Sequence, residues 1–210
     1  MKSNKYIYRF CKRAVDIIFS LIGCIMLVPI TLLIMLANFL ANDNGPVFYS
    51  QKRYGKDGKP FKLYKYRSMV KGADRKLKRY LKKNPEAKQE FDEFKKLKND
   101  PRVTPVGKFI RKTSLDEFPQ FINILKGEMS LIGPRPVVLD EIKMYGENKD
   151  KFLSVKPGLT GYWQANGRSN TSYDERIEME LYYVDNASFW LDVKIFFKTF
   201  ISVFKGEGAV

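Results

Sequence analysis

The longest apolar run of the chain lies near its N-terminus, where residues 17–41 read IIFSLIGCIMLVPITLLIMLANFLA without a charged side chain. A helix of about 25 residues is long enough to cross the hydrocarbon core of a bilayer once. The run is apolar all round, which favours a membrane helix over the buried helix of a soluble core. It is also too long for the core of a signal peptide. The pattern therefore predicts a membrane anchor over residues 1–45.

Basic side chains stand on both sides of this run, five within residues 2–13 and five within residues 52–62. Lys and Arg beside a membrane segment favour the cytoplasmic face, so a straight span would place one group on the wrong side. Pro29, near the middle of the run, removes a helix hydrogen bond and bends the axis. We therefore expect a helix–break–helix hairpin at Pro29. It would form a re-entrant, monotopic anchor in the inner membrane, with the rest of the chain in the cytoplasm.

Alternating residues after the anchor predict a β-hairpin over residues 47–69, closed by a turn at Gly55-Lys-Asp-Gly58. On its second strand Lys65 and Arg67 share a face, because side chains alternate along a strand. Solvated surface charge is the ordinary interpretation of such a pair.

Helical spacing of apolar positions predicts the next elements. Residues 71–100 form a Lys/Glu-rich helix pair, interrupted at Asn84-Pro85 and packed on the domain. Residues 187–205 are amphipathic, which fits a helix lying on the membrane and a helix covering the core equally well. No repeat or linker divides residues 46–210. We expect one mixed α/β, helix-rich domain there, without a doubly wound nucleotide fold.

The net charge of the chain limits the kinds of partner that it is expected to bind. Lys and Arg number 38 against 23 Asp and Glu, a net charge of +15 that indicates an anionic partner. Nucleic acid, acidic lipid and phosphorylated substrates all qualify, but no nucleic-acid-binding motif is recognisable. The chain has no histidine. This excludes a Ser-His-Asp triad and His-ligated zinc, so acid–base chemistry falls to carboxylates, Lys, Tyr or Cys.

The stretch TSLDEFPQF sets two adjacent carboxylates, Asp116 and Glu117, in this basic chain. One interpretation is a capping box, in which Ser114 and Glu117 satisfy each other's backbone N–H groups. The other takes Asp116 as the helix cap. Pro119 favours the second, because proline is tolerated only in the first helical turn. Both carboxylates would then stand at a helix N-terminus, where phosphates also bind.

Two later segments are rich in glycine and carry arginine. GEMSLIGPRP presents Arg135 on a rigid turn, and KPGLTGYWQANGR contains Trp163, Asn166 and Arg168. Glycine-rich loops near arginine can cradle phosphate through backbone N–H groups. Neither segment is a P-loop or a GxGxxG motif.

In this order, the motifs resemble one family, the bacterial sugar transferases or monotopic phosphoglycosyl transferases. The resemblance runs from residue 12 to the C-terminus and rests on KRAVDIIFSL, PVFYSQKRYGKDGKPFKLYKYRSM, NDPRVTPVGKFIRKTSLDEFPQ, LKGEMSLIGPRP, KPGLTGYWQANGR and YYVDNASFWLDVKIFFKT. Within the family the chain is most similar to undecaprenyl-phosphate galactose phosphotransferases.

This resemblance implies transfer of a hexose-1-phosphate, with galactose first, from a UDP-sugar to undecaprenyl phosphate. UMP is released, and the product begins an exopolysaccharide, capsule or O-antigen repeat. UDP-glucose or an N-acetylhexosamine donor and an inactive membrane scaffold are the alternatives. Membrane lipid is an expected partner and nucleic acid is not. A homodimer is an expectation from longer relatives.

The resemblance also assigns residues. The family's catalytic dyad falls on Asp116 and Glu117, with Asp116 as the nucleophile of a covalent phosphosugar intermediate and both carboxylates as ligands of Mg²⁺. The expected phosphate-binding residues are Arg111, Arg135, Arg168, Lys65 and Arg67. The expected nucleotide or sugar pocket contains Trp163, Gly161 and Asn166.

Overall fold

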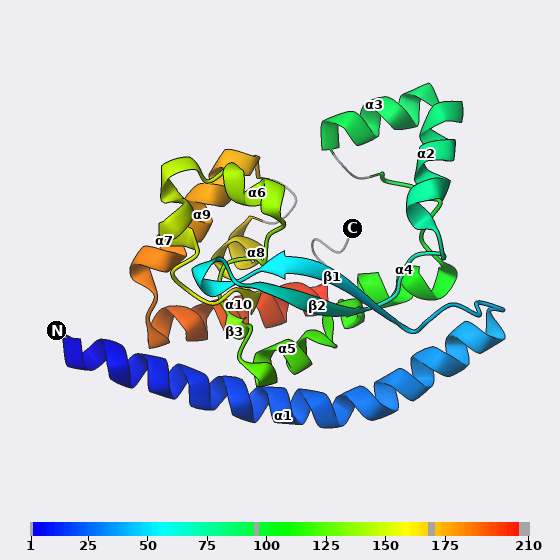
Figure 1. The fold of residues 1–210 in the computed structure, drawn as a ribbon. Coiled ribbons are helices and arrows are strands. Elements are labelled where there is room, and N and C mark those ends of the chain that lie inside the picture. The colour runs from blue at the N-terminus through cyan, green and yellow to red at the C-terminus, as the bar shows by residue number, and fades with distance from the viewer. Residues whose placement is uncertain (1, 95–96, 168–170, 206–210) are drawn as a thin grey trace.

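The structure is a computed structural model that describes residues 2–94, 97–167 and 171–205. A long helix, α1 (Lys2–Leu40), lies under a mixed α/β body, with its concave side toward that body (Figure 1). The body begins with an antiparallel hairpin of β1 (Phe48–Tyr54) and β2 (Pro60–Tyr66), joined by the short turn η1 (Lys56–Gly58). This hairpin confirms the sequence prediction.

The remaining elements are mostly short helices, as the helix-rich α/β prediction expects. They are α2 (Ala73–Lys83), α3 (Pro85–Phe94), α4 (Pro105–Lys112), η2 (Leu115–Glu117), α5 (Gln120–Lys126), β3 (Ser130–Ile132), α6 (Leu139–Lys143), η3 (Gly146–Asn148), α7 (Lys149–Phe152), β4 (Gly158–Thr160), α8 (Tyr162–Asn166), α9 (Tyr173–Asn186) and α10 (Phe189–Lys205).

Among the described helices, only α1 is long and apolar enough to cross a membrane. It runs unbroken through Pro29, so the predicted helix break is wrong. Pro29 lies on the exposed outer face, and the helix bends gently toward the body instead of folding back (Figure 1). Contacts on the inner face support this course. The Thr31 hydroxyl donates to the Leu27 carbonyl at 2.6 Å and lies 2.7 Å from the Tyr66 hydroxyl.

The first half of α1 is bonded to the body. The Arg13 guanidinium donates to two carbonyls at the end of α5, at 2.7 and 2.9 Å. The Asp16 carboxylate accepts from the Ser130 hydroxyl at 3.0 Å and from the Leu131 N–H at 2.9 Å, and all three groups are buried. Gly23 lets the Phe121 ring approach so closely that a Cβ there would collide with it. The N-terminal half of α1 is therefore part of the body's packing.

The outer face of α1 is apolar and exposed, and α10 continues it. The Phe19 and Phe196 rings meet edge to face at 5.7 Å, and the Lys12 ammonium pairs with Asp192 at 2.7 Å. On its inner side α10 buries Ile195 in the core. The described side chains of α10 that are large, apolar and exposed are Phe189, Trp190, Phe196, Phe197, Phe200 and Ile201. One face of α10 therefore covers the core, as one interpretation expects, and its other apolar face is exposed. Contact of that face with a membrane stays a prediction.

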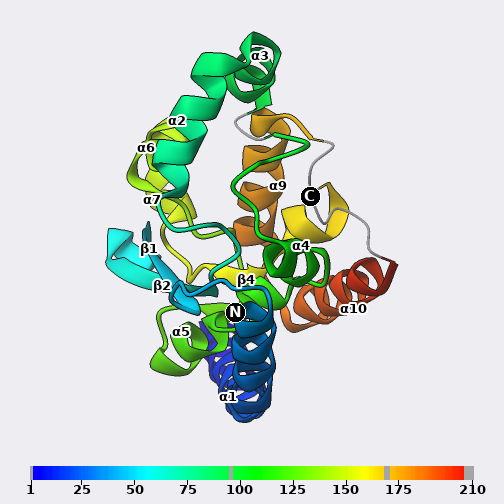
Figure 2. The same cartoon turned by 90° about the vertical axis from the view of Figure 1, so that its right-hand side faces the viewer.

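Helices α2 and α3 confirm the predicted interruption at Asn84-Pro85. They contact each other and project from the body as an arm (Figures 1 and 2), so the expectation that they lie along the domain is wrong. Of the residues in α2, only Leu77 is buried. So narrow an apolar stripe cannot hold a helix along a core.

The two glycine-rich segments meet where β3 pairs with β4 in parallel, Ser130 opposite Gly158. Gly161 lies against this pair, and a Cβ there would collide with the carbonyl oxygen of Gly133. Gly161 thus allows close packing of the two backbones. Whether it also lines a substrate pocket stays a prediction.

Replacement of Asp16 tests how tightly α1 is bound to the body. We expect Asp16→Ala to lower stability by about 2–4 kcal/mol, because two buried donors lose their acceptor. The measurement is the melting temperature in detergent, with Asp74→Ala, an exposed acid of α2, as the matched control. Equal melting temperatures for the two variants would contradict this account.

Candidate active site

Asp116 and Glu117 lie on η2, the short turn between α4 and α5. Ser114 precedes them in the left-handed conformation (φ 57°) and its side chain makes no capping bond, so the capping-box interpretation is wrong. The helix α5 begins only at Gln120, after Pro119, so Asp116 is not its cap either. The left-handed residue redirects the chain and stops α4 from running into α5. Such strain in a non-glycine residue is typical of functional sites.

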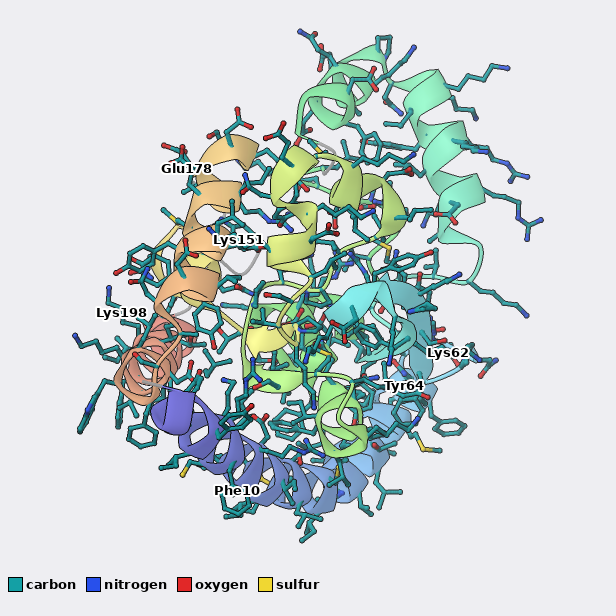
Figure 3. The ribbon with its side chains drawn as sticks, turned by 60° about the vertical axis from the view of Figure 1, so that its left-hand side comes forward. Phe10, Lys62, Tyr64, Lys151, Glu178 and Lys198 are labelled. Carbon is teal, nitrogen blue, oxygen red and sulfur yellow. The ribbon has the colours of Figure 1, made fainter. Side chains whose placement is uncertain are left out.

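The hairpin delivers Lys65 to these two acids. Its ammonium lies 2.7 Å from Glu117 Oε1 and 3.8 Å from Asp116 Oδ2. Lys65 comes from the strand end of β2, more than fifty residues earlier in the chain. Lys62 on the same strand is instead exposed, at the rim of the molecule (Figure 3). Tertiary structure therefore selects one lysine of the strand for the acids.

Burial raises the pKa of the Asp116 carboxyl, since only 15% of its side chain is exposed. Lys65 and Arg111 oppose this by favouring the ionised form, and the neighbouring Glu117 adds to the rise. The net direction is upward. Asp116 is therefore a poorly solvated carboxyl group.

Arg111 lies in the last turn of α4, just before the acids. Its Nε donates to the Ser68 hydroxyl at 2.9 Å, which orients the guanidinium. The helix can approach β2 closely because Gly107 packs on the Ser68 carbonyl, where a Cβ would collide. The Thr104 hydroxyl caps the helix by accepting from the Gly107 N–H at 2.9 Å. Two cationic groups, Arg111 and Lys65, thus influence the same carboxyl.

Two adjacent carboxylates are ligands of the kind that Mg²⁺ takes, and their role as a magnesium site stays a prediction. Among the described residues, no third His, Cys, Asp or Glu joins them to make a protein-only metal site. Magnesium commonly takes one or two carboxylates, with phosphate oxygens and water in the other positions. The Lys65 ammonium, 2.7 Å from Glu117, shows that the pair attracts a cation.

Arg135 and Trp163 lie together in a second polar region. The Arg135 guanidinium is 5.9 Å from the Trp163 ring centre, and that of Arg176 is 4.8 Å from it. The indole N–H donates to the Thr171 hydroxyl at 2.8 Å, which holds the ring. Sequence reasoning missed Arg176. The available signal was its position one turn before Glu180 on the inward stripe of α9.

Two other predicted residues bond to groups other than the two acids, and a third is not among the residues that the structure describes. The three nitrogens of the Arg67 guanidinium donate to Asp43 and to two backbone carbonyls, at the junction of α1 and β1. Asn166 is exposed and accepts from Lys198 at 2.7 Å. Arg168 lies outside the described residues. The roles assigned to these residues stay predictions.

Known proteins resemble the whole chain. It is 47% identical over 201 residues to the "Undecaprenyl-phosphate galactose phosphotransferase" of Salmonella typhimurium, which covers 96% of this chain and 42% of that relative. It is 41% identical over 206 residues to the "UDP-glucose:undecaprenyl-phosphate glucose-1-phosphate transferase" of Escherichia coli, covering 94% and 40%. The chain thus spans less than half the length of these two relatives.

A shorter relative matches along most of its length. The "Exopolysaccharide production protein ExoY" of Sinorhizobium fredii is 44% identical over 199 residues, which are 94% of this chain and 87% of that protein. The family described as "Bacterial sugar transferase" matches residues 7–206. The chain therefore belongs to the bacterial sugar transferase family.

Proposed function

We propose that this chain transfers a hexose-1-phosphate from a UDP-sugar to undecaprenyl phosphate, releasing UMP, as the first membrane step of exopolysaccharide assembly. The names of the relatives support this reaction class and name both galactose and glucose. Higher identity to the galactose enzyme favours UDP-galactose as the donor, with UDP-glucose as the alternative. The observation that carries the proposal is the pair Asp116–Glu117 held against Lys65 in a chain without histidine.

The proposed reaction has two displacements at one phosphorus. An Asp116 carboxylate oxygen bonds to the phosphorus next to the sugar, and the bond from that phosphorus to the UMP oxygen breaks. A phosphate oxygen of undecaprenyl phosphate then bonds to the same phosphorus, and Asp116 leaves as a carboxylate. One phosphoanhydride replaces another, so no further energy source is needed. The covalent step divides a difficult meeting of two anions into two easier reactions.

The main obstacle to the reaction is repulsion between anionic groups, and the basic residues reduce this repulsion. Lys65 and Arg111 favour the ionised form of Asp116 and would contact the oxygens of the transferred phosphate. A guanidinium fork suits such oxygens, as in Arg111. Magnesium, held by Asp116 and Glu117 when bound, would neutralise charge on the transferred phosphate. Glu117 would also orient the incoming acceptor phosphate.

The acceptor is a lipid, and the fold suits a membrane-surface enzyme. Residues in both halves of α1 are bonded to one body, from Arg13 and Asp16 in the first half to Thr31 in the second. A spanning helix would separate its ends by about 30 Å of hydrocarbon. We infer a monotopic helix that lies along the cytoplasmic side of the inner membrane, with its apolar outer face and that of α10 in lipid. The dyad would then face phosphates at the headgroup level.

The nucleophile is tested with UDP-galactose labelled at the phosphate next to the sugar. We expect intact-mass analysis to detect a covalent phosphosugar adduct in the wild type and in Glu117→Gln, but not in Asp116→Asn. UMP should be released as the adduct forms, and undecaprenyl phosphate should remove the label. Labelled lipid product without any adduct would overturn the nucleophile assignment and leave the transfer reaction standing.

Stability provides the control for Asp116→Asn. The folded-state pKa of this carboxyl lies above its unfolded value, so its contribution to stability is present at low pH and is lost as pH rises through the folded pKa. At neutral pH the buried, ionised Asp116 carboxylate therefore lowers the stability of the fold. The neutral amide of the variant does not have this unfavourable burial of charge. We expect Asp116→Asn to lose transfer while its melting temperature stays equal to the wild type or rises. A lower melting temperature would attribute the loss to misfolding.

Lys65→Met tests the electrostatic role of the lysine. Because Lys65 lowers the pKa of Asp116, its loss should move the acid limb of the kcat/KM profile to higher pH. The matched control is Lys62→Met, which removes an exposed lysine of the same strand. An unmoved acid limb in Lys65→Met would exclude Asp116 as the group that titrates.

Membrane topology is tested by labelling single cysteines in a variant with Cys11 and Cys24 replaced by alanine. We expect a cysteine introduced at Tyr6, an exposed position near the start of α1, to resist a membrane-impermeant reagent in intact cells. Lys78→Cys on the arm should resist it equally, and both should react after permeabilisation. Reaction of the Tyr6→Cys variant alone in intact cells would show that α1 crosses the membrane.

A further inference from the structure

A second group of charges lies near the turn of the hairpin, and the transfer chemistry described above does not use it as a unit. We call it the arginine cluster, and its members are Arg53, Arg135, Arg176, Glu141 and Glu180. Arg53 and Lys65 share one face of the hairpin, since their cross-strand partners are Phe61 and Tyr49. Lys65 lies opposite Tyr49, four residues before Arg53 on β1, and four residues of a strand span about 13 Å. The arginine cluster is therefore separate from the dyad.

Positive charge exceeds negative charge in this cluster, three guanidiniums against two carboxylates. Burial lowers the pKa of Arg53, Arg135 and Arg176 lower it further by repulsion, and Glu141 opposes this. The pKa of Arg176 is raised instead, because burial is outweighed by the attraction of Glu180 and its neighbours. Only 12% of the Arg53 side chain and 9% of the Arg176 side chain are exposed. Close like charges with so little solvent are unfavourable unless an anion joins them.

Three hydrogen-bond donors in and beside the cluster also lack partners. They are Arg53 Nε, Arg176 Nη2 and the Tyr173 hydroxyl, each buried and without an acceptor among the residues that the structure describes. A buried donor without an acceptor costs about 1–3 kcal/mol. The Tyr173 ring lies against Arg176, 5.0 Å from ring centre to guanidinium carbon. These donors therefore need an acceptor that the described chain does not supply.

The two carboxylates of the cluster differ in how firmly they are held. Glu180 is 1% exposed and accepts from Arg176 Nε at 3.3 Å and from the Tyr145 hydroxyl at 2.6 Å. Glu141 is 27% exposed. Its Oε2 accepts from the Val138 N–H at 3.2 Å, at the start of α6, and its oxygens lie 3.4 Å from Arg53 and 4.0 Å from Arg176. Those distances are long for ion pairs, so Glu180 holds Arg176 more firmly than Glu141 holds either arginine.

We propose that the arginine cluster is a binding site for a phosphate-type dianion, which enters between Arg53 and Arg176 by displacing the Glu141 carboxylate. Phosphate offers more acceptor oxygens than a carboxylate and pairs with guanidinium forks in a bidentate way. It would satisfy the unpaired donors and balance the excess charge. Two sources share this chemistry, free inorganic phosphate and the phosphate of a uridine nucleotide. Only the second source rests on the proposed function.

The chain carries its own reporter. It has two tryptophans, and Trp163 stacks on Arg176. Trp190→Phe on the exposed face of α10 leaves Trp163 as the single fluorophore. In this background the protein, in detergent and without magnesium, is titrated with inorganic phosphate and separately with UMP, and the dissociation constants are read from Trp163 fluorescence.

Two substitutions are expected to change the affinity for phosphate and UMP in opposite directions. We expect Glu141→Gln to tighten binding about tenfold, because the competing charge is removed while the shape is kept. Arg53→Gln should weaken it by about tenfold or more. Arg79→Gln removes the same charge from the exposed face of α2 and should change binding less than twofold. A structural ion-pair network would lose stability in Glu141→Gln and gain no affinity.

The outcomes separate this site from the proposed reaction. Binding of both anions supports a site for the phosphate group itself, and binding of UMP alone assigns the nucleotide as the source. A fluorescence change that persists in Arg53→Gln, or no change with either anion, overturns the proposal. The titration needs no turnover, so it can be repeated in Asp116→Asn. If neither anion binds, the proposed transfer reaction still stands. If the transfer reaction is disproved, anion binding to the arginine cluster still stands.

Discussion

The contacts between α1 and the body are the constraint on which the other parts of the structure depend. Arg13 and Asp16 bond to the ends of α5 and β3, so these segments start from positions set by the helix. The turn carrying the two acids immediately precedes α5. A long apolar helix that a soluble core would bury is here half-covered, with one stripe bonded to protein and the rest exposed. This arrangement fixes the position of Asp116 and Glu117 relative to the apolar outer face of α1.

The acids themselves occupy an unfavourable environment that the surroundings maintain. A left-handed serine, a buried proline and a poorly solvated aspartate follow one another within a few residues. The left-handed serine and the buried carboxyl each cost free energy, and the packing of α4 and α5 on the hairpin offsets this cost. Lys65 and Arg111 keep Asp116 partly available as an anion despite its burial. At Asp116, burial disfavours the ionised carboxylate, and Lys65 and Arg111 favour it.

Positive charge serves distinct purposes in different parts of the molecule. Arg67 and Arg13 satisfy backbone carbonyls, Lys65 pairs with the two acids, and the arginine cluster holds more cations than anions. The net charge of +15 describes none of these roles separately. Burial and partner geometry distinguish them, and both depend on contacts between residues distant in sequence.

The sequence by itself determined the local elements, because they depend on neighbouring residues. The hairpin turn at Gly55–Gly58, the helix interruption before Pro85 and the end of the apolar helix near residue 40 could all be read from adjacent side chains. The adjacent acids could be read in the same way. Ordered motifs also carried the family resemblance.

Tertiary structure decided what depends on distant contacts. Pro29 does not break α1, because the body supports the inner face of the helix where local rules predict a hinge. Ser114 does not cap a helix, because packing forces a left-handed turn there. The spacing of Arg176 and Glu180 along α9 was visible in the sequence, but helical spacing alone does not show that both side chains are buried beside Arg53. Only folding brought three guanidiniums and two carboxylates to one place, and the electrostatic energy of a charge depends on its surroundings more than on its position in the chain.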